Sequence, residues 1–212
     1  MQPVSSDNSE LLRRAASGDQ QALGELFTQH TDRLRRMVQL RLNRRLQGRV
    51  DPSDVIQEAY LEISQHLAEY AREPKLPFFL WLRHITGQKL ITVHRRHLGA
   101  QMRDADMKVS LHHGAFPQAS SISLAEQLLG RLTSASHVAM RAELQIHVQT
   151  ALNGMDSMDR EVLALRHFEL LSNGEVATVL GLSKTAASNR YVRALERLRE
   201  IIESIPGLVD CL

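Results

Sequence analysis

Residues 172–199 constrain the fold of this chain more than any other stretch, because they encode two helices joined by a tight turn. Ser172 and Glu175 have the spacing of a capping box, in which each side chain bonds the backbone N–H of the other residue. Gly181 follows the last apolar residue of the first helix, where a left-handed helix end is common. Ser183 is an N-cap for the second helix, whose apolar residues recur every three or four positions. This pattern is typical of a helix-turn-helix, whose second helix enters the major groove of DNA.

The outward face of that second helix is polar and basic, and no acidic residue lies between Lys184 and Arg193. An ordinary solvated helix mixes charges to form i,i+4 pairs, whereas this helix does so only later, at Glu196 and Glu200. A helical hairpin with a solvated basic face is the alternative interpretation. The candidate DNA-binding residues on this face are Lys184, Thr185, Ser188, Asn189, Arg190, Arg193 and Arg197.

Composition favours an all-α fold, because Leu, Ala, Arg, Glu and Gln dominate and only 4% of residues are aromatic. The formal net charge of +2 implies no general affinity for polyanions, but the charge is unevenly placed. Residues 33–49 (RLRRMVQLRLNRRLQGR) contain no acid, whereas residues 51–73 are acidic. This asymmetry indicates one surface for nucleic acid and another for a basic protein partner. For residues 33–49, a solvated basic face and a phosphate-facing role both stay open.

Several classes of protein are disfavoured by what the sequence contains. The single cysteine, Cys211, provides neither a disulfide framework nor a cysteine zinc site. No apolar run has membrane length and no signal-peptide core is present, so a cytoplasmic location is expected. His112 and His113, with His97 nearby, lie in a segment without an ordered scaffold and are interpreted as solvent-exposed. No metal or other cofactor is expected.

Residues 51–70 are expected to form an amphipathic helix, with Asp51 as N-cap and Pro52 at the first helical position. Asp54 and Glu58 have the i,i+4 spacing of a metal-binding or acid–base pair. No histidine falls on that face at helical spacing, which disfavours this interpretation. An apolar Leu61 among acids instead indicates a protein-binding surface. The outward face comprises Asp54, Gln57, Glu58, Leu61, Glu62 and Gln65.

Residues 78–97 begin with an aromatic cluster and end with basic residues. Such aromatics are usually core residues, but rings beside a basic helix also suit a protein that stacks the bases of a single strand. The polar and basic surface of this segment is expected to contain Arg83, Gln88, Lys89, Thr92, His94, Arg95, Arg96 and His97.

Residues 99–136 have no hydrophobic period and contain Gly99, Gly114, Pro117 and a serine-rich run. A structureless loop of this length inside one compact domain is uncommon, so a domain boundary is expected here. A short helix over residues 123–132 is a candidate within it. The predicted architecture is therefore two helical domains, residues 9–98 and 137–205, joined by a long, mostly irregular linker, residues 99–136.

The block at 51–97 resembles the second domain of the extracytoplasmic-function (ECF) sigma factors of bacterial RNA polymerase. Their pattern D-x-x-D-[LV]-[VI]-Q-E-[TA]-[FY]-L matches residues 51–61 without a gap, and F-x-x-W-L-x-x-I matches residues 78–85. Their fourth-domain patterns match residues 160–166, 176–183 and 189–194. The chain looks especially similar to the long-linker members found in planctomycete-type bacteria. It departs from the common pattern at Gln88 and Thr92, where Asn and Asp are frequent, and at Gly87 inside a helix.

The resemblance implies a promoter-specificity subunit that binds core polymerase and promoter DNA and performs no catalysis itself. The helix at 51–70 would dock on the clamp helices of the largest polymerase subunit through Asp54, Gln57, Glu58 and Leu61. The segment 78–97 would recognise and melt the minus-ten element through Trp81, Gln88, Lys89, Thr92, His94, Arg95 and Arg96. The helix-turn-helix would read the minus-thirty-five element, and an anti-sigma factor is a further partner that the family implies. No small-molecule substrate and no membrane insertion are expected.

Two other hypotheses fit parts of the sequence. A stand-alone helix-turn-helix regulator would bind a two-fold DNA site as a dimer and would not need the block at 51–97. A metal-dependent nucleic-acid enzyme would use Asp51, Asp54 and Glu58, and measured hydrolysis with a divalent metal would support it.

Overall fold

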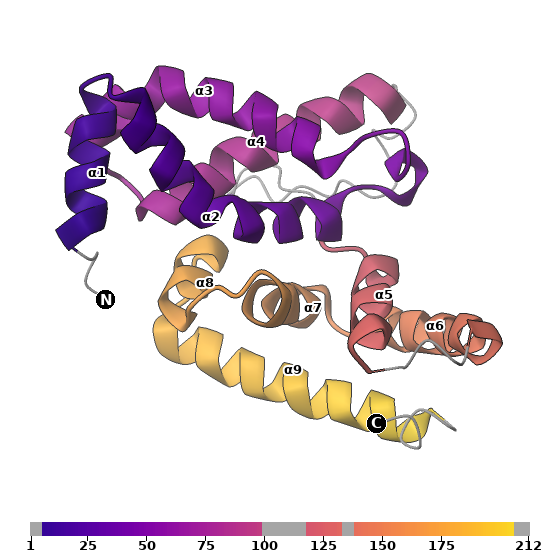
Figure 1. The fold of residues 1–212 in the computed structure, drawn as a ribbon. Coiled ribbons are helices and arrows are strands. Elements are labelled where there is room, and N and C mark those ends of the chain that lie inside the picture. The colour runs from indigo at the N-terminus through magenta and orange to yellow at the C-terminus, as the bar shows by residue number, and fades with distance from the viewer. Residues whose placement is uncertain (1–5, 99–117, 133–137, 206–212) are drawn as a thin grey trace. The chain divides into compact units, whose positions relative to one another are not determined.

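The computed structural model describes residues 6–98, 118–132 and 138–205, and these form helices and turns with no strand (Figure 1). They fall into two compact units, one on each side of the boundary between Pro117 and Gln118. The predicted all-α fold class is therefore confirmed. His112, His113 and Cys211 lie outside the described residues.

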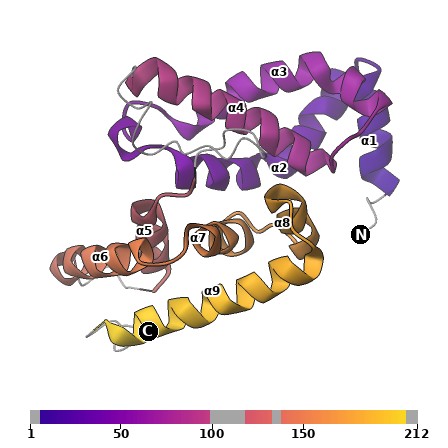
Figure 2. The same cartoon turned by 180° about the vertical axis from the view of Figure 1, so that it is seen from behind.

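The first unit packs three long helices together. It comprises α1 (Ser6–Ala16), α2 (Gln20–Arg41), the short 3₁₀ helix η1 (Arg44–Leu46), α3 (Pro52–Arg72) and α4 (Phe78–Leu98). Helices α2, α3 and α4 lie side by side in both views (Figures 1 and 2). Their core is built from large side chains with less than 2% exposure, which include Leu26, Leu34, Met37, Ile63, Leu82 and Leu90.

The beginnings of α2 and α3 follow from local sequence. Asp19 accepts a hydrogen bond from the backbone N–H of Ala22 at 3.0 Å. Asp51 accepts one from the N–H of Ser53 at 2.7 Å, and Pro52 occupies the first helical position. A proline costs little there because its missing N–H would have no partner within the helix. These caps fix where the two helices begin and therefore which of their faces turn toward the core.

The second unit comprises α5 (Ser121–Leu132), α6 (Val138–Asn153), α7 (Ser157–Leu163), the π-helical turn η3 (Ala164–Phe168), α8 (Asn173–Leu180) and α9 (Lys184–Ser204). Helix α9 runs along α7 and α8 (Figure 2). Val162, Leu165, Phe168, Val176 and Ala194 are buried between these elements. This packing holds the two helices of the predicted helix-turn-helix in place.

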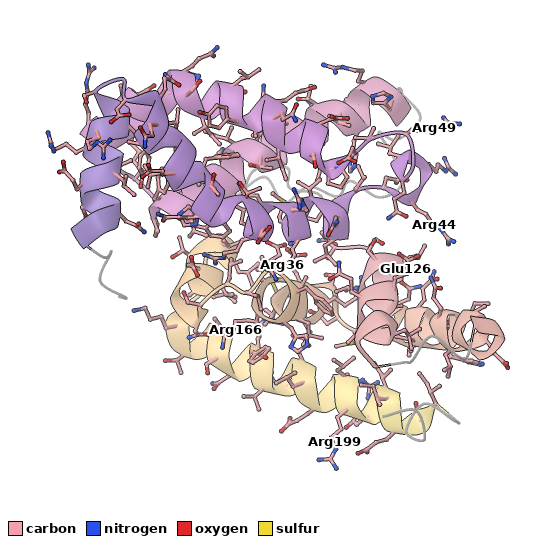
Figure 3. The ribbon with its side chains drawn as sticks, in the orientation of Figure 1. Arg36, Arg44, Arg49, Glu126, Arg166 and Arg199 are labelled. Carbon is pink, nitrogen blue, oxygen red and sulfur yellow. The ribbon has the colours of Figure 1, made fainter. Side chains whose placement is uncertain are left out.

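Helix α5 lies within the range expected to be an irregular linker, yet it belongs to the second unit. It begins at Ser121, two residues before the candidate helix, and packs on α6. Leu124 and Leu129 are each 1% exposed, so the helix is held by burial of its apolar side. Its polar side adds a hydrogen bond from Gln145 Nε2 to Glu126 Oε1 at 3.1 Å (Figure 3). The ordered second unit thus begins before the expected boundary at residue 136.

Two arginines of the sequence pattern at 160–166 act within the fold. Nη1 of Arg160 donates to the carbonyl oxygens of Leu152, Asn153 and Met155 at 2.9–3.2 Å, and so caps the end of α6. Nη1 of Arg166 donates to the carbonyl of Leu171 at 3.0 Å, and its guanidinium lies 4.9 Å from the centre of the Tyr191 ring (Figure 3). Arg166 therefore ties the turn before α8 to α9.

Leu170 is the one described residue other than glycine with a positive φ, 58°, and its side chain is 49% exposed. A Cβ in this left-handed conformation costs roughly 1–2 kcal/mol. We expect Leu170→Gly to have a free energy of unfolding about 1 kcal/mol higher than Leu170→Ala, because only glycine removes the Cβ. Urea unfolding of both variants measures the difference, and an alanine variant as stable as the glycine variant would contradict it.

Candidate nucleic-acid and protein interfaces

The helix-turn-helix forms as its caps predict. Ser172 Oγ accepts from the N–H of Glu175 at 3.2 Å, and Glu175 Oε2 accepts from the N–H of Ser172 at 2.7 Å. Gly181 ends α8 with φ of 63°, and Ser183 Oγ accepts from the N–H of Ala186 at 3.1 Å. The first turn of α9 is thereby set at a fixed angle to α8.

The exposed face of α9 near its N-terminus carries five of the seven candidate DNA-binding residues. These five side chains are exposed, whereas Ala187 and Ala194 of the same helix are buried. Val192 lies on the same face with 50% exposure and is not among the residues predicted to contact DNA. Val192 follows Ser188 by four residues, and this helical spacing places the two side chains on one face of α9. The exposed candidates are Lys184, Thr185, Ser188, Asn189 and Arg193.

The other two candidates on α9 are engaged within the protein. Nη1 of Arg190 lies 2.9 Å from Oδ1 of Asp159 and 3.5 Å from Oδ1 of Asp156, the N-cap of α7. This residue therefore holds α9 against the start of α7. Arg197 pairs with Glu200 at 2.7 Å. It lies about 20 Å along the helix from Lys184, whereas base contacts usually come from the N-terminal part of a recognition helix.

The aromatic stretch at the start of α4 is largely internal. The rings of Tyr70 and Trp81 are stacked, with centroids 4.4 Å apart and planes at 19°, so one face of the indole is covered. The Tyr70 hydroxyl donates to the carbonyl of Leu76 at 2.9 Å and closes the loop between α3 and α4. Burial raises the pKa of Tyr70 above its ordinary value. Beside the two rings is a cavity of about 410 Å³, lined by Glu62, His66, Glu69, Tyr70, Glu73, Lys75, Leu76, Trp81 and Ile85.

The candidate residues further along α4 differ in their surroundings. Lys89 forms an ion pair with Glu62 across to α3. The Thr92 hydroxyl donates to the carbonyl of Gln88 at 3.0 Å. Arg95 and Arg96 are exposed near the C-terminus of the helix, and Nη1 of Arg96 lies 3.6 Å from Oε1 of Glu58. Gln88, Thr92, Arg95 and Arg96 remain accessible to a ligand.

The expectation that His94 lies on the polar surface of α4 is wrong. Its side chain is 5% exposed, and Nε2 accepts a hydrogen bond from the backbone N–H of Asn43 at 3.2 Å. Burial lowers the pKa of His94 from 6.5 to about 4, so the imidazole is neutral at neutral pH. Arg83, also expected outside, is 4% exposed. Polar residues lie inside here because α4 is packed against both α2 and α3.

The outward stripe of α3 is arranged as the sequence predicts. Val55, Ile56, Ala59 and Ile63 face the core, whereas Leu61 is 62% exposed. A large apolar side chain that projects from an acidic stripe is unusual for a solvated face and suits a protein contact. The four candidates have i, i+3, i+4 and i+7 spacing and therefore share one side of the helix. They are Asp54 and Gln57, both exposed, the half-buried Glu58, and Leu61.

Within the described ranges, no three His, Cys, Asp or Glu side chains are grouped so that they could hold a metal ion. The carboxylates of Asp51 and Glu58 have other partners, the Ser53 N–H and Arg96. Among the same residues, no helix combines the length and apolar character that a bilayer span requires.

Comparison with known proteins adds an independent line of evidence. A family model described as ECF sigma factor matches residues 5–203. The RNA polymerase sigma factor NccH of Alcaligenes xylosoxydans xylosoxydans is 30% identical over 92% of this chain and 94% of its own length. The RNA polymerase sigma factor CnrH of Cupriavidus metallidurans is 29% identical over 96% of this chain and 98% of its own.

A solved structure of CnrH in complex with the cytosolic domain of CnrY matches 93% of this chain and 98% of that chain. The TM-score is 0.55 at 24% sequence identity, so the match supports a shared fold.

Proposed function

The chain belongs to the ECF sigma factor family and is an RNA polymerase sigma factor, and from this premise we propose that three of its surfaces divide the work of promoter recognition. The acidic stripe of α3 binds core polymerase, the exposed side of α4 engages the minus-ten element, and the N-terminal face of α9 reads the minus-thirty-five element. The observation that carries the proposal is the pairing of an exposed Leu61 in an acidic stripe with exposed basic faces on two other helices.

For core binding, the α3 stripe suits the clamp helices of the largest polymerase subunit. Leu61 supplies an apolar anchor, and Asp54 supplies a negative charge on the same side of the helix. Both side chains are exposed and therefore accessible to a partner. Interface energy is concentrated in a few buried anchors, whereas surrounding polar groups set orientation and association rate.

For the minus-ten element, strand separation would place a base in the cavity beside Trp81. The volume of about 410 Å³ lies within the usual range for ligand pockets. Glu62 and Glu69 on its lining offer acceptors for base amino groups. Gln88 and Thr92 would contact neighbouring nucleotides, and Arg95 and Arg96 would hold phosphates. Lys89 would contribute only after release from Glu62.

For the minus-thirty-five element, the exposed residues of α9 offer complementary modes of readout. Asn189 has the geometry for adenine and Arg193 for guanine, and Val192 can contact a thymine methyl group. Lys184, Thr185 and Ser188 at the first turns would position the helix on phosphates. Arg190 would act indirectly, by holding α9 against α7.

Arg193→Ala is expected to weaken promoter binding by holoenzyme by about 1–3 kcal/mol, or roughly 5- to 150-fold. Binding to a panel of minus-thirty-five point variants distinguishes the mode of contact: a base contact gives relaxed specificity at one position, and a phosphate contact a uniform loss. Arg199→Ala is the matched control, because Arg199 is exposed on the same helix but pairs with Glu203 at 2.6 Å (Figure 3). Run-off transcription unchanged by Arg193→Ala would refute the assignment of this face.

The rival hypotheses have less support. A stand-alone regulator leaves the α3 stripe and the α4 face without a role. A metal-dependent enzyme would need grouped metal ligands, and no three His, Cys, Asp or Glu side chains are so grouped among the residues that the structure describes. From its membership of the ECF sigma factor family, we propose that the chain itself is non-catalytic and acts in the cytoplasm beside the polymerase. The long-linker, planctomycete-like subtype stays a prediction.

We also propose that a protein inhibitor controls this chain. The solved structure of CnrH contains the cytosolic domain of CnrY, which supports an anti-sigma partner for a protein of the same fold. Co-purification of this chain with candidate membrane-protein cytosolic domains, followed by in-vitro transcription with and without each domain, tests this proposal.

A further inference from the structure

A cluster of cationic side chains lies at one end of the first unit, and none of the surfaces assigned above includes all of it. Its members come from two segments far apart in sequence, η1 with the turn after it and the last turn of α4. Figure 3 shows Arg44 and Arg49 pointing away from the ribbon at the loop between α2 and α3. The exposed members are Arg44, Arg45, Arg49, Arg95, Arg96 and His97.

The fold brings these two segments together through a specific contact. The N–H of Asn43, the N-cap of η1, donates to Nε2 of His94 across 51 residues of sequence at 3.2 Å. Leu46, at the end of η1, is 1% exposed, and Val93 of α4 is 4% exposed. Both backbones are therefore anchored on the core, while the arginines that flank Leu46 and those that follow Val93 are exposed.

The positive charge of this cluster is poorly balanced within the protein. Arg96 pairs with Glu58 at 3.6 Å, and no ion pair is seen for Arg44, Arg45, Arg49 or Arg95 among the described residues. Basic residues in the last turn of α4 offset the negative end of the helix dipole. The helix dipole of α4 does not account for the arginines of η1, because η1 is a separate three-residue helix that meets α4 through the contact between Asn43 and His94. Like charges held close repel one another, so a partner of opposite charge would relieve this repulsion.

We propose that Arg44, Arg45 and Arg49, together with Arg95, form a phosphate-binding surface for duplex DNA adjacent to the segment melted by α4. This inference rests on the proposed minus-ten role of α4. Arginine suits such a surface because its planar guanidinium bonds two phosphate oxygens at once. The cluster lies about 21 Å along α4 from Trp81, at 1.5 Å per residue. Stacking at Trp81 requires an unpaired base, whereas phosphates are available on paired DNA as well.

Duplex DNA fits better than an acidic protein surface. The cluster contains no exposed apolar residue that could serve as an interface anchor, since Leu46 and Val50 are both buried. The polymerase-binding stripe on α3 does have such an anchor in Leu61. A surface made of arginines alone gains its affinity mainly from counterion release, which is the typical behaviour of phosphate contacts.

The test compares wild-type holoenzyme with R44A/R45A/R49A holoenzyme in binding a fork-junction promoter at several salt concentrations. Each lost phosphate contact lowers the slope of log affinity against log salt by about 0.9. We expect the slope of the triple variant to be smaller by about 2–3, with the largest loss of affinity at low salt. R13A/R199A is the control, because both arginines are exposed, form ion pairs within their own helices and belong to neither of the two segments of the cluster. Circular dichroism melting verifies that the variants are folded.

Three other outcomes would overturn the proposal. An unchanged salt slope for the triple variant would show that the cluster does not touch phosphate. Weaker binding of the variant to core polymerase, measured by competition with labelled wild-type chain, would assign the cluster to a protein contact. An equal loss with a fork that lacks the adjacent duplex would assign it to single-stranded DNA. Wild-type chain that gives no promoter-dependent transcription would instead contradict the proposed function itself.

Discussion

Leu61→Ala combined with Asp54→Ala is expected to weaken binding to core polymerase by about 100- to 1,000-fold. Hot-spot residues at protein interfaces each contribute about 2 kcal/mol or more when truncated, and each 1.4 kcal/mol is tenfold in affinity. Leu61 is 62% exposed and Asp54 is exposed, so neither truncation removes core packing. The loss should therefore appear in binding, and the free energy of unfolding should fall by no more than the roughly 0.3–1 kcal/mol that a carboxylate contributes in the first turn of a helix.

Competition with labelled wild-type chain for core polymerase measures this effect. Ile146→Ala is the apolar control, because Ile146 is 65% exposed on α6, outside the proposed interface. Glu69→Ala is the acidic control on the same helix, because Glu69 is exposed further toward its C-terminus. Core affinity within threefold of the wild type for the double variant would contradict the assignment of this stripe.

Glu58 is left out of that variant because it has a second role in the structure. Its carboxylate lies 3.6 Å from the guanidinium of Arg96, a candidate phosphate-binding residue. Removal of Glu58 would alter the charge presented to DNA as well as to polymerase. The pair also links the polymerase-binding stripe of α3 to the DNA-binding side of α4. Polymerase binding near Glu58 would engage its carboxylate and so leave Arg96 available to a phosphate.

The features that could be predicted from sequence depend on neighbouring residues. Ser172 and Glu175 are three residues apart, and the two hydrogen bonds of their capping box form as the pattern requires. Gly181 takes the left-handed conformation that ends α8. The exposed stripe of α3 follows from helical periodicity, because a single side of that helix is apolar and is buried. Short-range geometry and one-sided burial determine all of these features.

The features that could not be predicted depend on contacts between distant segments. The partners of Arg190 are 31 and 34 residues away, so its position on a basic helix face suggested DNA contact while the structure pairs it with Asp159 and Asp156. His94 is buried because α4 is covered on more than one side, and a rule that places polar residues outside fails for such a helix. Helix α5 is longer than the short helix predicted within the linker. Its apolar residues are buried against α6, a contact that the sequence of α5 alone does not reveal.

Acidification is expected to destabilise the first unit through His94, by about 3 kcal/mol once the pH has fallen to about 4. The pKa of this imidazole is about 4 in the folded protein and 6.5 as a model value for the unfolded chain. Each pKa unit corresponds to 1.36 kcal/mol. Since the unfolded chain binds the proton more readily, the stability is fully present above pH 6.5 and declines as the pH falls toward 4. About 2 kcal/mol of it should already be lost at pH 5.

The structural reason is the hydrogen bond between Asn43 and His94. Nε2 accepts the Asn43 N–H, so the neutral imidazole must carry its proton on Nδ1. A proton on Nε2 would remove this acceptor and place a charge in a site with 5% exposure. Acid should therefore separate η1 from the end of α4 and disperse the arginine cluster that the contact assembles.

Urea unfolding of the full chain between pH 7.5 and 5, with a probe in the first unit, measures the dependence. His94→Gln is expected to be less stable at pH 7.5 and to have a smaller loss on acidification, because glutamine does not titrate. His66→Gln is the matched control for the loss of an imidazole, since His66 is exposed on α3. Carboxylates also titrate near pH 4, so the difference between wild type and His94→Gln above pH 5 is the diagnostic quantity. Parallel pH slopes for these two proteins would show that burial of His94 does not control the acid stability of this unit.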